Sequence, residues 1–441
     1  MTSDSQSFVP PTARLGRRTF VQVGALGLGG WSLADHLRLS AASSTPLPGD
    51  TAVIQIFMGG GPSHIDMYDL KPHAPSEIRG EFTPISSSVA GYSFSEHLPR
   101  QAAVMDRLAI VRSVQHTNPT HLPASHWMMT GYEATVSAKT NFNPSIGSVV
   151  SRLRGANRIG LPGYVALPKK QLIGGSAYLG LAHNPFAPNS DPSQEEFEVK
   201  NLSAAGDLNW PRMNERRRLR AGLDRLAGRL EQSEDFESLD EFSKAAYEMV
   251  TGGRAAAAFD LSQESRHLRD QYGNHSGGQS CLLARRLVEA GVTFVTVLSG
   301  ASWDTHTDNF RTLKNNSLPK MDSAISALVT DLYERGLDKR VLVIAHGEFG
   351  RTPHINKDAG RDHWPGAACV LFSGGGIRTG QMIGETDSRA AWPVTEPYSP
   401  GDVLSTVYHF LGINYHHNFR DQGGRVFPVL NEGSPIRELY S

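Results

Sequence analysis

The sequence predicts an α/β protein built on a central, mostly parallel β-sheet. Short apolar runs rich in β-branched residues alternate with segments whose apolar residues recur at helical spacing. Runs that are apolar throughout are typical of strands covered on both faces, and helices on both sides of a parallel sheet provide that cover. We therefore expect three layers with the sheet in the middle. A chain of 441 residues is compatible with one large domain of this class.

Five apolar runs are expected to form strands. The first, residues 51–57 (TAVIQIF), is followed by Gly59-Gly60-Gly61-Pro62, which indicates a tight loop. This loop lacks the lysine and the spacing of a nucleotide-binding P-loop. The other expected strands are residues 108–114, 292–298, 340–345 and 367–372.

Helices are expected between these strands. Their residue ranges are 126–130 (ending at Gly131), 279–290 (ending at Gly291), 315–335 and 402–411, with Asp402 as the N-cap of the last. Between about residues 205 and 275 the chain becomes rich in Arg and Glu, with leucines at helical spacing, so we expect a helical insertion or cap there.

Composition excludes several classes of protein. Charged residues make up 20% of the chain and the formal net charge is −1, so the sequence carries no electrostatic footprint for nucleic acid. Cys281 and Cys369 each lie in an apolar run, where a thiol behaves as a small buried side chain. We expect neither a disulfide framework nor a nucleic-acid partner.

The first 45 residues resemble a twin-arginine signal peptide. Arg17 and Arg18 begin the run RRTFV, residues 23–34 carry no charge, and small residues follow at 40–43. An amphipathic surface helix would instead have charges spaced through residues 23–34. The apolar centre is too short and too weakly apolar for a membrane span. We therefore expect export of the folded protein by the twin-arginine translocase, with a periplasmic or extracellular location and no stable membrane span.

Histidine and acidic residues gather in four segments close to predicted strands. In an open α/β sheet, ligands bind beyond the carboxyl ends of the strands. Imidazole and carboxylate together suit zinc, manganese or iron, although each such residue taken singly can also be a turn or capping group. Arg351 and Arg361 are expected to bind an anionic substrate group through bidentate hydrogen bonds. The four segments are residues 59–69, 302–308, 346–352 and 360–364.

Five motifs resemble those of domain of unknown function family 1501, a group of twin-arginine-exported proteins related to sulfatases. They are GGGPSHIDMYDLKP, QSCLLARRLVEAGVTFV, SWDTHTDNF, HGEFGRTPHIN and GRDHWPGA. The resemblance covers nearly the whole chain after the signal. It implies that residues 46–441 form an alkaline phosphatase-like three-layer sandwich of the alkaline phosphatase and sulfatase superfamily, with metal ions at the strand ends.

The resemblance also implies a set of metal ligands. Of the two aspartates after the first strand, Asp66 is preferred to Asp69 because it lies closer to the strand. Ala345 stands where the family's late Asp-His-Gly element has its aspartate, so a site for one divalent ion and a site for two both stay open; zinc and manganese are the expected metals. Glu348 is a candidate ligand or a hydrogen-bond partner of a ligating histidine. The expected ligands are Asp66, Asp304, His306, His346, Glu348 and His363.

The nucleophile is less clearly marked. Residues 121–131 (HLPASHWMMTG) are similar in spacing to the sulfatase signature Cys-x-Pro-Ser-Arg followed by Leu-x-Thr-Gly, and the modified cysteine falls on His121, so formylglycine cannot form there. The signature predicts that His121 begins a helix and faces the metal loops. Several alternatives stay open: an oxygen nucleophile from Thr117, Thr120 or Ser125, His121 as phosphoryl acceptor, a metal-activated water, or a ligand role for His116, His121 and His126.

These observations together predict an exported metal-dependent hydrolase of phosphate or sulfate esters, with Thr120, His121 and Arg351 as catalytic residues. The expected substrate is a small anionic ester or a sulfated or phosphorylated glycan. The alternative is a non-catalytic exported protein that uses the same fold as a binding scaffold. Metal content separates the two, because only the enzyme requires a bound ion.

Overall fold

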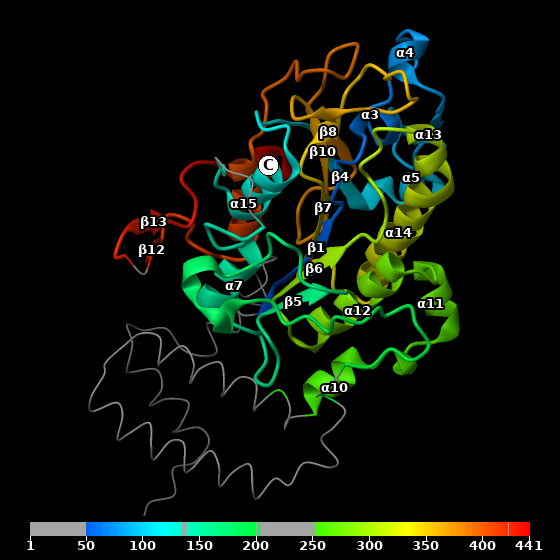
Figure 1. Cartoon of the computed structure of the whole chain (residues 1–441). Helices are drawn as coiled ribbons and strands as arrows, with labels where there is room; N and C mark the ends of the chain where they lie inside the picture. Colours follow the sequence, from blue (N-terminus) through cyan, green and yellow to red (C-terminus); the bar gives the residue numbers. More distant parts are fainter. Residues whose placement is uncertain (1–49, 135–138, 200–201, 203–248, 250–252, 422) are drawn as a thin grey trace, which may run out of the picture. The chain divides into compact units, whose positions relative to one another are not determined.

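The computed structural model describes residues 50–134, 139–199, 202, 249, 253–421 and 423–441. Its centre is a seven-stranded sheet with the strand order β11-β4-β10-β7-β1-β6-β5 (Figure 1). Strand β10 runs antiparallel to its neighbours β4 and β7, and the other strands run parallel to one another. The strands are β1 (Ala52–Phe57), β4 (Leu108–Val114), β5 (Tyr164–Leu167), β6 (Phe294–Leu298), β7 (Val341–His346), β10 (Ala368–Gly374) and β11 (Gln381–Ile383).

The predicted fold class is confirmed, and all five predicted strands are present. Strands β1, β4, β6, β7 and β10 begin and end close to the predicted bounds because buried strands are marked by continuous apolar runs. The sequence analysis missed β5 and β11. Both lie at the edges of the sheet and have only four and three residues, too few for a clear apolar pattern.

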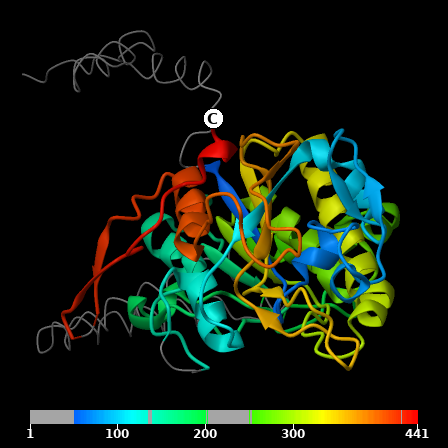
Figure 2. The same cartoon turned by 90° about the horizontal axis from the view of Figure 1, so that it is seen from above.

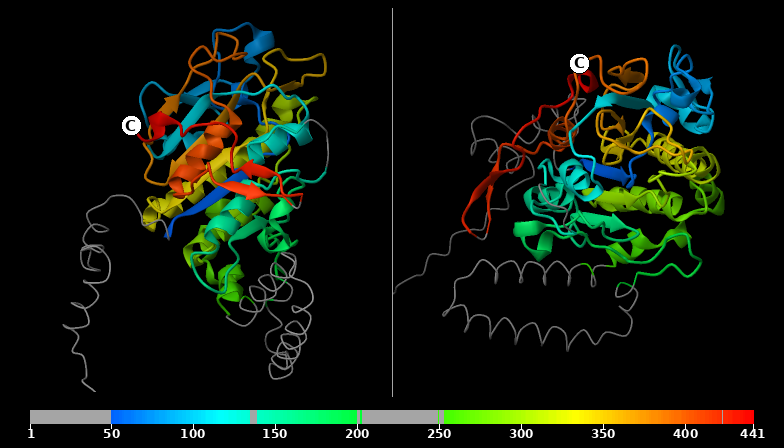
Figure 3. Two further views of the ribbon diagram at one scale, coloured as in Figure 1. Left: turned by 90° about the vertical axis from the view of Figure 1, so that its left-hand side faces the viewer. Right: turned by 45° about the horizontal axis from the view of Figure 1, so that its top comes forward.

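Helices cover both faces of the sheet. On one face lie α5 (Pro99–Ala103), α12 (Ser276–Ala290) and α14 (Leu318–Glu334); on the other lie α6 (His121–Thr130), α7 (Ile146–Arg154) and α15 (Pro400–Phe410). Figures 2 and 3 show the same division from other directions. Ile54 packs into the core on the first face, and its neighbour Val53 packs into the core on the second. The alternation of strand side chains thus produces the three-layer sandwich.

Smaller elements occupy the connections. The short helices and turns are α3 (His64–Met67), α4 (Ser76–Arg79), η2 (Met105–Arg107), η3 (Ala177–Leu179), η4 (Leu181–His183), α10 (Arg254–Phe259), η6 (Leu261–Gln263), α11 (Arg266–Tyr272), α13 (Asn309–Thr312), the π-helix η7 (Leu313–Ser317) and η8 (Arg437–Leu439). The two-stranded sheets pair β2 (Pro84–Ser86) with β3 (Ser93–Ser95), β8 (Gly350–Arg351) with β9 (His363–Trp364), and β12 (Asn418–Arg420) with β13 (Val426–Pro428).

One predicted helix start was wrong. Helix α15 has Ser399 as its N-cap, three residues before the expected Asp402. Asp402 is the third residue of a capping box: its carboxylate accepts the backbone N–H of Ser399, while the Ser399 hydroxyl oxygen accepts the N–H of Asp402. Pro400 occupies the first helical turn, where its missing N–H costs nothing.

Two predicted segments lie largely outside the described residues. The twin-arginine signal (residues 1–45) is entirely outside them, and so is most of the helical insertion predicted at about residues 205–275. Near the end of the second segment the structure describes α10, η6 and α11. Among the described residues, no helix is long and apolar enough to cross a membrane.

The strand directions bring four polar segments to one edge of the sheet. Strands β1, β4, β6 and β7 run parallel, so the loops that follow them open at the same edge. Because β10 is antiparallel, the loop that precedes it also opens there. Residues 59–69, 302–308, 346–352 and 360–364 therefore meet at this carboxyl edge.

A buried ion pair between Asp66 and Arg361 joins two of these loops. The Nε and Nη2 atoms of Arg361 donate to the two carboxylate oxygens of Asp66 at 2.8 and 2.9 Å. Arg361 is 0% exposed, and its remaining N–H groups donate to the carbonyls of Ile78, Thr352 and Pro353. The expected binding of substrate by Arg361 is therefore wrong, because all five of its N–H groups are used inside the protein.

We predict that Asp66→Asn lowers the free energy of unfolding by about 3–5 kcal/mol, because it leaves the buried Arg361 without its counter-charge. As a control, Asp362→Asn removes a carboxylate that is half exposed, and we expect a change below about 1 kcal/mol. Denaturant unfolding of both variants measures the difference. Equal, small effects would show that the Asp66–Arg361 pair does not stabilise the fold.

Candidate metal centre

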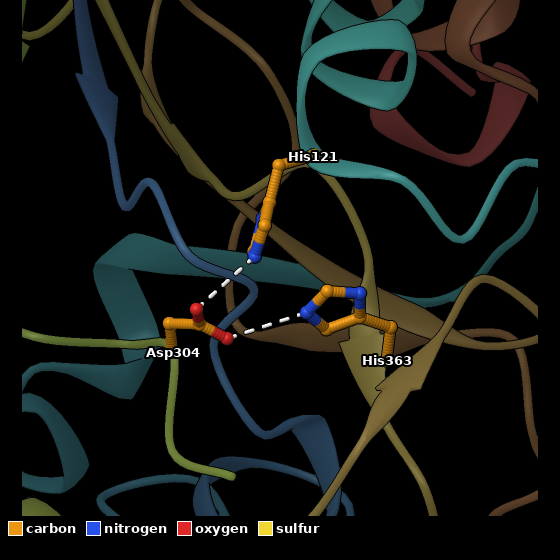
Figure 4. Close-up of side chains that lie close together, drawn as sticks. All are labelled: His121, Asp304 and His363. Carbon is orange, nitrogen blue, oxygen red and sulfur yellow. Dashed lines mark hydrogen bonds and ion pairs between the residues drawn. The ribbon is translucent and has the colours of Figure 1, made fainter. Parts of the chain in front are cut away.

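Four side chains from three separate segments meet at the carboxyl edge of the sheet. Asp304 and His306 follow β6, His121 is the first residue of α6, and His363 lies in β9. The Oδ2 atom of Asp304 lies 3.2 Å from Nε2 of His121, and its Oδ1 atom lies 3.1 Å from Nε2 of His306 and 3.3 Å from Nε2 of His363. Figure 4 shows the rings of His121 and His363 pointing at the Asp304 carboxylate.

Each of the three imidazole rings makes a hydrogen bond through its Nδ1 atom, on the side of the ring away from Asp304. The partners are carboxylate or carbonyl oxygens, which only accept hydrogen bonds, so each Nδ1 carries the proton. In a neutral ring the Nε2 atom then has the free lone pair. The acceptors are the carboxylate of Glu348 for His121 (2.6 Å), that of Asp362 for His306 (2.6 Å) and the carbonyl of Pro119 for His363 (2.7 Å).

In this arrangement the Nε2 lone pairs of the neutral imidazole rings face one another and the carboxylate oxygens of Asp304. The Nε2 atoms of His306 and His363 lie only 2.9 Å apart, and the ionised Asp304 faces both. Such contacts repel unless a proton or a cation lies between them. Histidines that bind metals have the same pattern, with Nδ1 hydrogen-bonded to an oxygen and Nε2 facing the ion. The group therefore fits a divalent metal that accepts nitrogen and oxygen ligands.

The charges around the group favour a cation as well. The pKa of His121 is raised, chiefly by its hydrogen bond to Glu348 and further by the charges of Glu348 and Asp304. Partial burial alone would raise the pKa of Asp304, but the hydrogen bond and charge of Arg351, with help from His121 and His363, lower it to about 2. Asp304 is therefore ionised at neutral pH and available as a ligand.

Arg351 contacts Asp304 from the protein interior and not from the solvent side. Its side chain is 0% exposed, and Nη2 donates to Oδ1 of Asp304 at 2.6 Å. The other donors bind main-chain carbonyls: Nε that of Gly61, Nη1 that of Arg361 and Nη2 also that of Gly60. These contacts make Arg351 a residue that positions Asp304, whereas the sequence analysis expected it to contact the substrate.

The glycine-rich loop after β1 positions Glu348. Both carboxylate oxygens of Glu348 accept the N–H of Gly60, at 2.8 and 3.1 Å. Gly60 has φ +115°, and a Cβ atom there would lie 2.7 Å from the backbone nitrogen of Asp304. Glu348 is 2% exposed and bonds the far side of the His121 ring. Of the two roles left open for Glu348, these contacts favour the partner of a ligating histidine.

Two expected ligands have other contacts. Asp66 is bound by Arg361, Ser63 and Asn309. His346 is fully buried at the end of β7, where its Nε2 accepts the side-chain amide of Gln55 and its Nδ1 donates to a main-chain carbonyl. Burial lowers the pKa of His346 to about 4, so the ring is neutral. Among the described residues, neither side chain contacts Asp304, His306 or His363.

Of the three evenly spaced histidines, only His121 reaches the group. The Nε2 of His116 donates to the carbonyl of Glu348, and its Nδ1 accepts the N–H of Asn118. Both nitrogens of His126 are likewise bonded to the main chain. Of the three hydroxyl candidates, Ser125 is buried, whereas Thr117 and Thr120 are exposed. Thr120 is the N-cap of α6, makes no side-chain cap hydrogen bond and directly precedes His121 in the chain.

The sequence analysis assigned no role to Asp362 or to the carbonyl of Pro119, which orient His306 and His363. The neighbouring Asp362 and His363 were visible as a pair in the sequence. The pair does not indicate, however, that Asp362 binds the ring of His306 from another loop. That contact depends on how β9 and the loop after β6 meet in space.

Comparison with known proteins gives one family and distant structural likenesses. No curated protein matches the sequence. Similar solved structures include the sulfatase PsFucS1 from Pseudoalteromonas sp. (13% identity, 86% of this chain and 70% of that chain covered, TM-score 0.38). The phosphonate monoester hydrolase SpPMH from Silicibacter pomeroyi is similar at 11% identity, covering 88% of this chain and 76% of that chain, with a TM-score of 0.35. A family model described as Protein of unknown function (DUF1501) matches residues 50–440, and the chain therefore belongs to this family.

Proposed function

We propose that this protein is a metal-dependent hydrolase of phosphate or sulfate esters. The observation that supports it most directly is the convergence of three Nε2 atoms on Asp304, with every ring held at Nδ1 by an acceptor. Asp304 and the three histidines would hold a divalent ion, which would supply Lewis-acid polarisation of an ester oxygen. Zinc and manganese are the metals that such a mixture of imidazole and carboxylate suits.

Exposure of the group supports a catalytic site over a structural one. The side chains of Asp304 and His306 are 46% and 42% exposed, so an ester can approach them from solvent. Structural zinc sites are closed by four protein ligands. The ligand atoms of His121, Asp304 and His363 all lie within 4.8 Å of one another, so these three residues would hold the ion. His306 would contribute a further nitrogen, since its Nε2 atom lies 3.1 Å from Oδ1 of Asp304.

The N-terminus of α6 provides a site for the anionic part of the ester. The first N–H groups of a helix have no partner within the helix, and no side chain caps this end. His121 and Leu122 supply these N–H groups beside the candidate ligands, whereas Pro123 has none to supply. Together with the helix dipole they favour a phosphate or sulfate oxygen. We propose that this helix end takes the role that the sequence analysis gave to Arg351 and Arg361.

Thr120 is our candidate for the nucleophile. Its side chain is exposed, and it directly precedes the candidate ligand His121. His121 itself is not proposed as a phosphoryl acceptor, because Glu348 binds its Nδ1 and Asp304 faces its Nε2. In this scheme the Thr120 oxygen forms a bond to phosphorus or sulfur while the bond from that atom to the alcohol oxygen breaks, and the hydroxyl proton ends on the departing alcohol. Water then cleaves the Thr120 ester, which releases phosphate or sulfate and regenerates the hydroxyl. Direct attack by water is the alternative.

We predict that protein prepared without chelators contains about one equivalent of zinc or manganese, and that Asp304→Ala and His363→Ala abolish it. Asp362→Asn should weaken metal affinity by roughly 10- to 100-fold, because it releases the ring of His306. His267→Ala, which changes an exposed histidine of α11, is the matched control and should bind metal like the wild type. Elemental analysis and metal titration measure these differences. Metal-free wild-type protein that takes up no added ion would support the scaffold alternative.

Activity is best tested with phosphate monoesters, phosphate diesters and sulfate esters, each with zinc and with manganese. We expect hydrolysis of at least one class. If Thr120 is the nucleophile, Thr120→Ala should lower kcat by about a hundredfold or more without changing Tm, and Thr120→Ser should restore much of the rate. A Thr120→Ala variant with the wild-type rate would assign the attack to water. If the protein with bound zinc or manganese hydrolyses none of these esters, the proposed activity is overturned.

We also propose that the protein is exported through the twin-arginine route, on the basis of Arg17, Arg18 and the uncharged residues 23–34. Replacing both arginines by lysine keeps the charge but removes the motif, so the protein should accumulate in the cytoplasm. Cell fractionation and immunoblotting of both forms make the comparison. Normal export of the double variant would exclude this route.

A further inference from the structure

A pocket of about 280 Å³ is lined in part by α6, the helix whose first residue is the candidate ligand His121. Residues that follow β4 line it, together with Trp127 of α6 and residues from the segment between β11 and α15. Its volume is near the lower end of the ~300–1,000 Å³ of small-molecule pockets, so it has room for about one ring-sized unit. None of its lining residues is Asp, Glu, Lys or Arg.

Two aromatic rings of the pocket are held in place by contacts behind them. Trp392 is 53% exposed, and its ring packs edge to face on Trp364, with centroids 5.0 Å apart. Trp364 is fixed in turn, because its Nε1 donates to the carbonyl of Ala391 at 2.6 Å. The ring of Trp127 lies 5.5 Å from that of His116, which is bonded to the main chain. Both indoles are therefore ordered surfaces before any ligand binds.

The polar lining suits a ligand with hydroxyl groups. In the described part of the chain, the side chains of Gln115 and Thr117 have no hydrogen bond within the protein, although both line the pocket. His116 is neutral, since burial lowers its pKa. A ligand with an apolar face and a hydroxylated edge satisfies both the indole rings and the free polar groups. An anionic group would find no cationic partner in this pocket.

The pocket is joined to the candidate metal centre through shared elements. Trp127 follows His121 by six residues on α6, about 9 Å along the helix axis. On the other side, Trp364 directly follows His363 in β9 and contacts Trp392. A molecule that places its anionic ester at His121 and His363 therefore extends toward the two indoles with its next unit.

We propose that this pocket binds a neutral sugar unit of a glycan whose sulfate or phosphate ester reaches the metal centre. The glycan as substrate rests on the proposed function, but the sugar site itself does not require catalysis. Trp392 and Trp127 stack on the apolar face of the sugar ring, and Gln115 and Thr117 bind its hydroxyl groups. In this proposal the metal centre binds the charged ester of the glycan, and the pocket binds its neutral sugar unit.

Isothermal titration of the full chain with neutral oligosaccharides tests this site. The probes are cellohexaose, chitohexaose, mannohexaose and agarohexaose. We expect at least one to bind, and Trp392→Ala to weaken it by about tenfold or more. Val394→Ala is the matched control: Val394 is 63% exposed on the same segment and does not line the pocket, so its affinity should stay within about twofold of the wild type. No binding by any of the four sugars, or equal affinity of the Trp392 variant, would overturn the proposal.

Two further measurements separate this site from the proposed activity. The His363→Ala variant should lose metal and ester hydrolysis but bind the neutral oligosaccharide as the wild type does. If the wild-type protein binds the sugar but hydrolyses no ester, the sugar site is supported and the proposed hydrolase activity is overturned. If it hydrolyses small esters but binds no sugar, the activity is supported and the sugar site is overturned. Binding of phenol or adenosine to the pocket, with no binding of the four sugars, would overturn the sugar proposal and assign the pocket to an aromatic ligand.

Discussion

The buried guanidinium of Arg351 is the contact on which the arrangement of the carboxyl edge depends. Arg351 follows β7, and its donors reach the carbonyls of Gly60 and Gly61 after β1, the carboxylate of Asp304 after β6 and the carbonyl of Arg361 before β10. One side chain thus connects four loops. Burying a charge costs free energy, and burial lowers the pKa of Arg351, but the Asp304 carboxylate and the ordered carbonyls offset that cost.

Behind this contact, a second arginine orders the outer loops. Arg361 is saturated by Asp66 and by three carbonyls, so its position is determined from all sides. Because Arg361 precedes Asp362 and His363 in the chain, it also determines where these two residues lie. Both arginine side chains are fully buried, so neither can contact a ligand. In the proposed site, a bound metal and the N-terminus of α6 would supply the positive charge that faces an anionic ester.

The candidate ligands form a group because each ring is oriented from the side opposite the proposed ion. Glu348, Asp362 and Pro119 come from different loops, yet all provide an oxygen to a Nδ1 atom. The three Nε2 atoms then face Asp304, an arrangement that a cation would stabilise. The same helix, α6, also lines an aromatic pocket without Asp, Glu, Lys or Arg, in which two polar side chains have no partner among the described residues. A charged centre beside a neutral one suits a ligand that has an ionised end and a hydroxylated body.

The sequence by itself determined five of the seven strands of the central sheet, most helix ends and the segments that carry the polar residues, because apolar periodicity and capping are local properties. It also placed Asp304, His306 and His363 among the candidate ligands. The spacing match to the sulfatase signature also predicted that His121 begins a helix and faces these loops. Only the tertiary structure decided that β10 is antiparallel, which brings His363 to the same edge as Asp304. Only the structure, too, assigned Asp66, Arg351 and Arg361 to buried contacts. The physical reason is that the partner of a buried charge, and the face to which a loop side chain turns, depend on residues far away in the chain that local pattern does not encode.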